Sequence, residues 1–169
     1  VLLFLAGRNM HNVEAITLFV KTVFRQLIQV YPDMRLLIGG SICNVLNESF
    51  KDERIVIHGE VSDLLKFYSL GDIVINPTVS GTGLKIKTFE AMAYGKIIIA
   101  HPHNTIGIYK KEEAPIFEAV NPDDYIKHID FLLKNEKHMV NTKKESIKYI
   151  MDLNGIVQSR FIQAIEDID

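Results

Sequence analysis

The residues best suited to chemistry in this chain lie in one glycine-rich loop and the segment after it. The loop reads Ser-Gly-Thr-Gly over residues 80–83, and Lys85, Lys87 and Glu90 follow it. Glycines let backbone N–H groups approach an anion closely, because no Cβ atom stands in the way. Amides and two ammonium groups suit a diphosphate, and a carboxylate suits sugar hydroxyls. We therefore expect a nucleotide-sugar site here.

A purely structural interpretation of the same residues is also open. Gly81 and Gly83 can form a tight turn without any ligand. Lys87 and Glu90 have the i,i+3 spacing of an exposed helical pair, which contributes only about 0.2–0.5 kcal/mol. A lone Gly-x-Gly does not discriminate between these two interpretations.

The elements that position the loop alternate between short apolar runs and helical patterns. The runs are rich in Ile, Leu and Val and do not alternate with polar residues, as is typical of parallel strands buried on both faces. They span residues 2–6, 35–38, 55–57, 73–76, 97–100 and 116–117. This pattern predicts an α/β fold, a Rossmann-like doubly wound parallel sheet of about six strands with helices on both faces.

In such a sheet, ligands bind at the carboxyl ends of the strands, where the topology switches. The loops after the first, third and fourth expected strands hold Arg8, residues 59–61 and residues 80–85. We therefore expect these three segments to share one edge of the sheet.

Helices are expected between the strands, each with its own start or stop signal. Asp63 and Asn121 are suited to N-caps, and Gly95 to the left-handed stop of a helix over residues 84–94. The residues expected on buried helical stripes are Ile16, Val20, Val23 and Leu27, then Ile126, Ile129 and Leu133, and finally Ile156, Val157, Phe161 and Ile165.

Composition limits the class of protein. The 169 residues are 47% hydrophobic, which is enough for one domain with a real core. The formal net charge of −2 provides no field for nucleic acid or an anionic membrane. Cys43 is the single cysteine, so no internal disulfide can form, and no apolar run approaches the roughly 20 residues of a membrane helix. The chain begins at Val1 inside an apolar run, so we expect it to be a truncated piece.

The run from Gly81 to Gly95 resembles the nucleotide-sugar loop and helix of family 4 glycosyltransferases, which are retaining GT-B enzymes. The family pattern of Gly-Thr-Gly, a Lys-x-Lys pair, a Glu-Ala-Met-Ala-x-Gly helix and a short apolar strand is matched over about twenty positions. Weaker similarities lie in Gly7-Arg8, in residues 31–40, in His58-Gly59-Glu60-Val61 and in residues 70–77. The resemblance implies that residues 1–169 are one domain, the C-terminal, nucleotide-sugar-binding half of a GT-B fold, without the N-terminal acceptor domain.

The resemblance also implies roles for particular residues. Arg8 and Lys85 would stabilise charge on the leaving diphosphate, with Lys87 a further candidate beside them. Glu90 would accept hydrogen bonds from the ribose hydroxyls. The remaining donor-binding residues would act mainly through their backbone near the phosphates, the sugar or the base, and are Gly7, Glu60, Val61, Gly81, Thr82, Gly83 and Leu84.

Two departures from the family pattern stand out. Many members carry two glutamates with seven residues between them; Glu90 matches the second, and Thr82 occupies the place of the first. The lysine that usually follows the Gly-Arg pair is missing, and residues His11 and Asn12 lie in that region. Phosphate charge would therefore rest on Arg8 and Lys85.

A whole enzyme of this kind is expected to transfer a hexose from a UDP- or GDP-sugar to a hydroxyl of a glycan or lipid-linked acceptor, retaining anomeric configuration. It would need no metal or other cofactor. The setting would be polysaccharide biosynthesis in the cytoplasm, at the inner face of the membrane if the missing half makes a peripheral contact. This half alone is expected to bind nucleotide weakly and to transfer little sugar.

Other interpretations remain. The chain could be half of a GT-B nucleotide-sugar 2-epimerase, or a non-catalytic Rossmann-like nucleotide-binding or scaffolding module. A dinucleotide oxidoreductase is disfavoured, because no Gly-x-Gly-x-x-Gly follows the first strand. His11 could contact the donor or cap the first helix, and the cap is favoured. His101 and His103 have metal-like spacing, but no neighbouring ligand cluster in the sequence supports a metal.

Overall fold

The sheet at the centre of the fold is parallel and six-stranded. A computed structural model describes residues 1–46, 50–81 and 86–166, with side chains as far as residue 163. The strand order is β3-β2-β1-β4-β5-β6. The strands are β1 (Leu2–Leu5), β2 (Leu36–Gly39), β3 (Ile55–Gly59), β4 (Ile73–Asn76), β5 (Ile97–Ala100) and β6 (Ile116–Glu118). The six expected strands are confirmed, with ends shifted by one or two residues.

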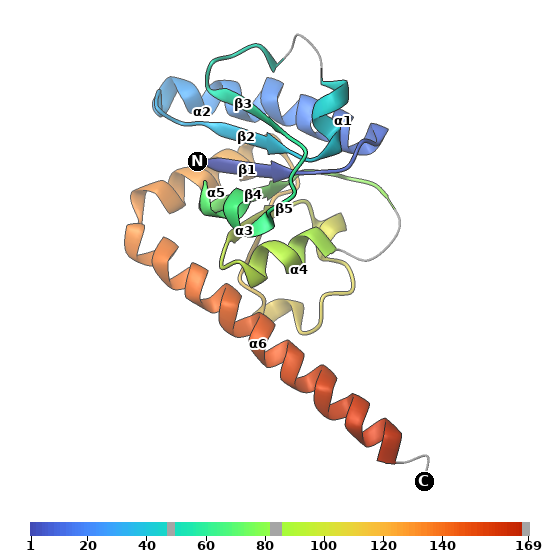
Figure 1. The fold of residues 1–169 in the computed structure, drawn as a ribbon. Coiled ribbons are helices and arrows are strands. Elements are labelled where there is room, and N and C mark those ends of the chain that lie inside the picture. The colour runs from blue at the N-terminus through green and yellow to red at the C-terminus, as the bar shows by residue number, and fades with distance from the viewer. Residues whose placement is uncertain (47–49, 82–85, 167–169) are drawn as a thin grey trace.

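Helices cover both faces of the sheet (Figure 1). They are α1 (Met10–Phe19), α2 (Arg25–Val30), α3 (Leu64–Ser69), α4 (Ile86–Ala93), α5 (Pro122–Lys134) and α6 (Glu136–Glu166). A π-helical turn, η1 (Val20–Phe24), joins α1 to α2, so residues 10–30 form one long helical rod. Short 3₁₀ turns occupy η2 (Ser41–Val45), η4 (Pro102–Thr105) and η5 (Lys111–Glu113).

Alternate residues of each strand contribute to two separate hydrophobic cores, since successive side chains of a strand point to opposite faces. Leu2 and Phe4 join the core under α1, η1, α2 and α5. Leu3 points the other way and joins the core under α3, α4 and the first part of α6. Both faces are therefore apolar along every central strand, which explains why the strands read as unbroken apolar runs. The predicted α/β doubly wound sheet is confirmed.

The expected caps are present. Asp63 accepts a hydrogen bond from the Lys66 N–H at the start of α3. Asn121 forms a capping box with Asp124 at the start of α5. Gly95 ends the α4 segment with φ +65°, the left-handed conformation that glycine tolerates best.

Two expected stripes need correction. Leu133 is 40% exposed, and its neighbour Leu132 is fully buried together with Ile129. In α6, Val157 and Phe161 are 58% and 68% exposed and Ile156 is half-buried, so the expected burial is wrong for Val157 and Phe161, while the side chain of Ile165 lies outside the described part. The periodicity showed an apolar face, but periodicity alone cannot say whether another surface of this chain covers it.

The first part of α6 packs on the domain and the last part extends beyond it (Figure 1). Ser146 is fully buried and donates a hydrogen bond to the Lys96 carbonyl at 3.0 Å. Lys143 pairs with Asp72 at 2.6 Å. These contacts fix α6 against the residues that directly precede β4 and β5. Among residues 1–46, 50–81 and 86–166, no helix is both long and apolar enough to cross a bilayer.

Candidate functional site

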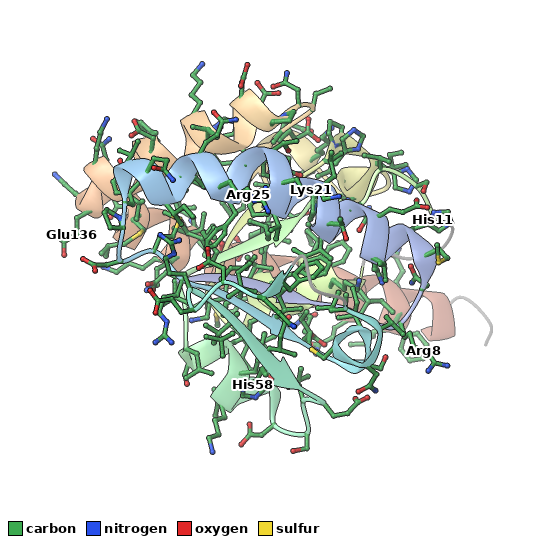
Figure 2. All side chains as sticks on the ribbon, turned by 90° about the horizontal axis from the view of Figure 1, so that it is seen from above. Arg8, His11, Lys21, Arg25, His58 and Glu136 are labelled. Atoms are coloured by element: carbon green, nitrogen blue, oxygen red, sulfur yellow. The ribbon has the colours of Figure 1, made fainter. Side chains whose placement is uncertain are left out.

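The candidate site lies at the carboxyl edge of the sheet, where the chain switches direction between β1 and β4. The strands on one side of this point are β1, β2 and β3, and those on the other are β4, β5 and β6. Gly7 and Arg8 follow β1, residues 76–81 follow β4, and residues 59–61 follow β3. Figure 2 shows Arg8 and His11 at the end of the molecule where α1 begins. The described parts of the three segments, Arg8, residues 59–61 and residues 80–81, therefore share one edge as expected.

A buried asparagine joins the two sides of this edge. The side-chain amide of Asn12 donates to the Gly7 carbonyl at 2.8 Å. Its oxygen accepts from Lys87 Nζ at 3.2 Å and from Thr78 Oγ1 at 3.3 Å. Asn12 is only 4% exposed, so its polar atoms are satisfied by these partners rather than by water. The network ties the turn after β1, the segment after β4 and helix α4 together.

The sequence pointed to the region of Asn12 only as the place of a missing lysine. Its buried role was missed, because an asparagine in the first turn of a helix usually reads as a capping residue. The cap is in fact Asn9, whose side chain accepts from the Asn12 N–H at 2.9 Å. His11, which was expected to cap this helix, instead places Nδ1 at 2.8 Å from Ser80 Oγ.

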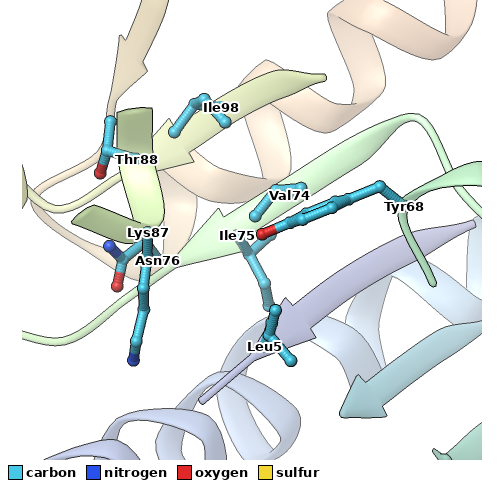
Figure 3. A pocket seen from close by; sticks show the side chains of 8 residues that line it. All are labelled: Leu5, Tyr68, Val74, Ile75, Asn76, Lys87, Thr88 and Ile98. Carbon is cyan, nitrogen blue, oxygen red and sulfur yellow. The ribbon is translucent and has the colours of Figure 1, made fainter. Parts of the chain in front are cut away.

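Lys87 is the described cation that lies deepest in this edge. Its side chain runs from α4 past Asn76 toward the end of β1, along a narrow pocket (Figure 3). Burial lowers the pKa of its ammonium group to about 8, and the nearby Glu90 carboxylate opposes that shift. Lys87 is therefore a cation at neutral pH that has lost part of its hydration. A buried, incompletely compensated ammonium group favours a nearby anion.

Glu90 lies one turn further along α4 and is held by a buried tyrosine. Tyr68 Oη donates to Glu90 Oε1 at 2.7 Å. The Tyr68 ring stacks on Tyr94 with centroids 4.8 Å apart. Burial, followed by the hydrogen bond to Glu90, raises the pKa of Tyr68, so its hydroxyl stays protonated and keeps donating. One side of the carboxylate is thereby fixed by α3.

The other described residues on the expected donor list lie along the same edge. Arg8 is exposed, and its backbone N–H donates to Ser41 Oγ at 3.0 Å. Glu60 is exposed, with a 3.5 Å contact to Asn44, while Val61 is half-buried against the core under α3. Gly81 has φ +123°, which only glycine adopts readily.

The remaining expected residues, Thr82, Gly83, Leu84 and Lys85, lie outside the described residues. Their contacts with a donor remain predictions, including the charge role of Lys85. Among the described residues, no three His, Cys, Asp or Glu side chains come together as metal ligands. The His101 ring instead accepts from the His103 N–H at 3.2 Å.

Comparison with known proteins was made against a family profile, relatives in sequence and solved structures. The profile described as "Glycosyl transferases group 1" matches residues 1–135. An "Uncharacterized 44.6 kDa protein in cps region" of Klebsiella pneumoniae is 22% identical over 151 residues, which are 84% of this chain and 39% of that protein. The chain thus spans well under half of that relative.

Two solved structures share the fold. The C-terminal domain of a glycosyl transferase group 1 family protein (LpcC) from Francisella tularensis gives a TM-score of 0.66 at 17% identity, covering 89% of this chain and 84% of that domain. Anabaena HepE in complex with UDP gives 0.70 at 10% identity, covering 96% of this chain and 48% of that one. At these identities the likeness establishes the fold: it is the one found in a C-terminal domain of this family.

Proposed function

The chain belongs to the group 1 glycosyl transferases, and we propose that it is the donor-binding half of a retaining enzyme of that family. It has the fold of one half of a GT-B enzyme. The proposed ligand is a nucleoside diphosphate sugar linked to UDP or GDP. The UDP complex of the structurally similar Anabaena protein favours UDP as the first ligand to test.

One observation carries this proposal: the network around Asn12 brings a backbone turn and a buried ammonium group to the switch point of the sheet. Lys87 Nζ lies 3.2 Å from Asn12 Oδ1, and the Asn12 side-chain amide donates a hydrogen bond to the Gly7 carbonyl. Open α/β sheets bind ligands at this point. Positive charge beside a glycine turn suits a diphosphate, and the carboxylate of Glu90 on the same helix suits ribose hydroxyls.

In the proposed reaction, the sugar moves from the diphosphate to an acceptor hydroxyl. Negative charge develops on the leaving diphosphate as the glycosidic bond breaks, and preorganised cations stabilise it. Arg8, Lys85 and Lys87 would supply that charge. The backbone at Glu60 and Val61 would meet the edge of the base. No metal is assigned a role in this proposal.

The whole enzyme would complete the site with an N-terminal acceptor domain. The acceptor would be a glycan or a lipid-linked saccharide, at the inner face of the cytoplasmic membrane. The relative from a cps region of Klebsiella pneumoniae supports polysaccharide biosynthesis as the setting. The transferred unit would be a hexose, and this half alone would transfer little of it.

Calorimetric titration tests the binding proposal. We expect the chain to bind UDP or GDP with a dissociation constant between micromolar and millimolar, corresponding to about −4 to −8 kcal/mol, and to ignore NAD. Glu90→Ala should weaken binding by about tenfold, because ribose hydroxyls lose a charged acceptor. Glu136→Ala is the matched control, since Glu136 lies at the end of the molecule opposite Arg8 and His11 (Figure 2).

The outcomes separate the candidate functions. Binding of neither UDP nor GDP would reject the donor-site proposal and favour a non-catalytic module. Binding that Glu90→Ala leaves unchanged would keep the nucleotide site but remove Glu90 from it. Binding of NAD, without binding of UDP or GDP, would point to a different class of enzyme.

A further inference from the structure

The turn after β5 makes an unusual set of contacts with the segment after β4. Three backbone carbonyls of residues 76–81 accept hydrogen bonds from side chains of residues 101–105, here called the support turn. Asn104 Nδ2 lies 3.0 Å from the Asn76 oxygen and 2.6 Å from the Thr78 oxygen. His103 Nε2 lies 2.8 Å from the Gly81 oxygen. The support turn therefore holds the segment that leads into the glycine-rich loop at three points.

The support turn is itself fixed within the fold. Asn104 and Thr105 are 6% and 1% exposed. The single hydroxyl hydrogen of Thr105 is shared between the Pro102 carbonyl, 2.9 Å from Oγ1, and the Glu118 carboxylate at the end of β6. On its other side, Thr88 of α4 approaches the Asn104 carbonyl at 3.4 Å. The turn thus contacts the segments on both sides of residues 82–85.

The chemistry of these contacts depends on donors. A backbone carbonyl only accepts, so Asn104 must present its NH₂ group, and its two hydrogens serve two carbonyls. His103 must carry hydrogen on Nε2. A fixed carbonyl also fixes its whole peptide plane, including the next N–H group. The contact with the Thr78 carbonyl therefore fixes the N–H group of Val79, whereas Pro77, which follows Asn76, has no N–H group.

We propose that His103 and Asn104 are positioning residues for the donor diphosphate: they hold the carbonyls of Asn76, Thr78 and Gly81 and so fix the segment that joins β4 to the phosphate site beside Asn12. This inference rests on the proposed donor site. Neither side chain is assigned a contact with the ligand. Their effect acts through the backbone, so it concerns the phosphates more than the base.

Variants that exchange donors for acceptors at constant size test this proposal. Asn104→Asp keeps the shape of the side chain but places carboxylate oxygens against two carbonyls. His103→Glu removes the donor, while His103→Gln keeps an N–H near the position of Nε2. The matched controls are Asn135→Asp and His128→Glu, since these residues also donate to backbone carbonyls, of Phe131 at 2.7 Å and of Glu118 at 2.9 Å.

Two measurements on each variant complete the experiment. One is calorimetric affinity for whichever of UDP and GDP the wild-type chain binds, and for the matching monophosphate. The other is amide hydrogen exchange of residues 78–81 in the ligand-free chain. We expect Asn104→Asp and His103→Glu to lower diphosphate affinity by about tenfold or more and monophosphate affinity by less than about threefold. Exchange at residues 78–81 should rise in both variants, while His103→Gln and the controls stay near wild type.

Each other result overturns the inference in a distinguishable way. Equal loss of both nucleotides, with a lowered Tm, would show a structural role only. Unchanged diphosphate affinity in Asn104→Asp would show that the contacts do not position the loop. If the wild-type chain binds no nucleoside diphosphate, the proposed function fails first, and exchange data then report only whether the support turn orders the segment.

Discussion

The two halves of the carboxyl edge are built in different ways. Over β1, β2 and β3, the edge is made of glycines: Gly7 follows β1, and Gly39 and Gly59 end β2 and β3. Over β4, β5 and β6, the edge is made of polar side chains bonded to backbone. Asn76 ends β4 and Glu118 ends β6, and each contacts the support turn.

The difference follows from what each half must accommodate. Gly40 has φ +94°, and a Cβ atom there would lie 2.4 Å from the Ala6 oxygen. The first half is thus held by close packing at its glycines, against backbone at Gly40 and against the Phe67 and Val61 side chains at Gly39. The second half adds side-chain donors to the carbonyls of Asn76, Thr78 and Gly81. A planar base suits the first surface, and a diphosphate suits a backbone segment of fixed orientation.

The largest effect is expected where the glycine half is packed most tightly. Gly40→Ala forces both a disfavoured φ and a clash with backbone, so the free energy of unfolding should fall by about 3 kcal/mol. Urea denaturation measures this. Gly59→Ala is the matched control: its φ is +86°, but nothing lies within 4 Å of the added methyl. Gly59→Ala should lower the free energy of unfolding by only about 1 kcal/mol. Equal losses in the two variants would show that the backbone conformation, rather than the clash at Gly40, determines the cost.

A somewhat smaller effect is expected at the residue that joins the two halves. Asn12→Ala leaves the Gly7 carbonyl and the Lys87 ammonium group without their partner. The unfolding free energy should fall by about 2 kcal/mol, and nucleotide affinity should fall with it. Asn141, an exposed asparagine on α6, serves as the control, and its alanine variant should stay within about 0.5 kcal/mol of wild type. If Asn12→Ala lowers the free energy of unfolding but leaves nucleotide affinity unchanged, Asn12 joins the two halves without contributing to the nucleotide site.

The third prediction concerns the buried cation between the halves. The pKa of Lys87 is about 8 in the free protein, and a bound diphosphate should raise it. Binding at pH 8 should therefore take up about half a proton, and affinity should fall about tenfold between pH 7 and pH 9. Calorimetry in buffers of different ionisation enthalpy measures the uptake. Lys87→Met should remove the dependence on buffer, and persistence of that dependence would assign the proton elsewhere.

The lowered pKa of Lys87 also affects stability: affinity should fall as the pH rises, whereas the free energy of unfolding should increase. The unfolded lysine keeps its ordinary value of 10.5, so the unfolded state binds more protons than the folded state between about pH 8 and 10.5. Stability should therefore rise with pH across this window, relative to the Lys87→Met variant. A flat difference between the two proteins would mean that Lys87 is better compensated than its burial indicates.

Most of the fold was predictable because apolar runs and caps are local signals. All six strands, the Asn121 cap and the Gly95 stop depend on residues close together in the chain. The exposure of Val157 and Phe161 was not predictable, since an apolar helix face does not show whether another part of the chain covers it. Leu133 was misplaced because Leu132 beside it satisfies the same pattern.

The site was predictable only where one segment carries the signal. The glycine-rich run indicated Lys87 and Glu90 as candidates directly, and the parallel topology predicted that Arg8, which follows β1, lies at the same edge of the sheet. The roles of Asn12, Tyr68 and Asn104 come from contacts across 22 to 75 positions of sequence, which no local pattern encodes. Buried polar networks of this kind depend on tertiary geometry, so they emerge only once the sheet is assembled.

The smallest effect is expected at the hydrogen bond between the Tyr68 hydroxyl of α3 and the Glu90 carboxylate of α4. Tyr68 lies on α3, which follows β3 of the glycine half, and Glu90 lies on α4, which follows β4; their 2.7 Å bond is a second link between the halves. Tyr68→Phe keeps the ring and removes the link, so stability should fall by about 0.5–1 kcal/mol and nucleotide affinity by about two- to threefold. Tyr94→Phe is the control, because its ring stacks on Tyr68 from the same cluster. A Tyr68→Phe loss as large as that of Glu90→Ala would mean that the tyrosine orients the carboxylate completely, and the two halves would then be coupled as strongly here as at Asn12.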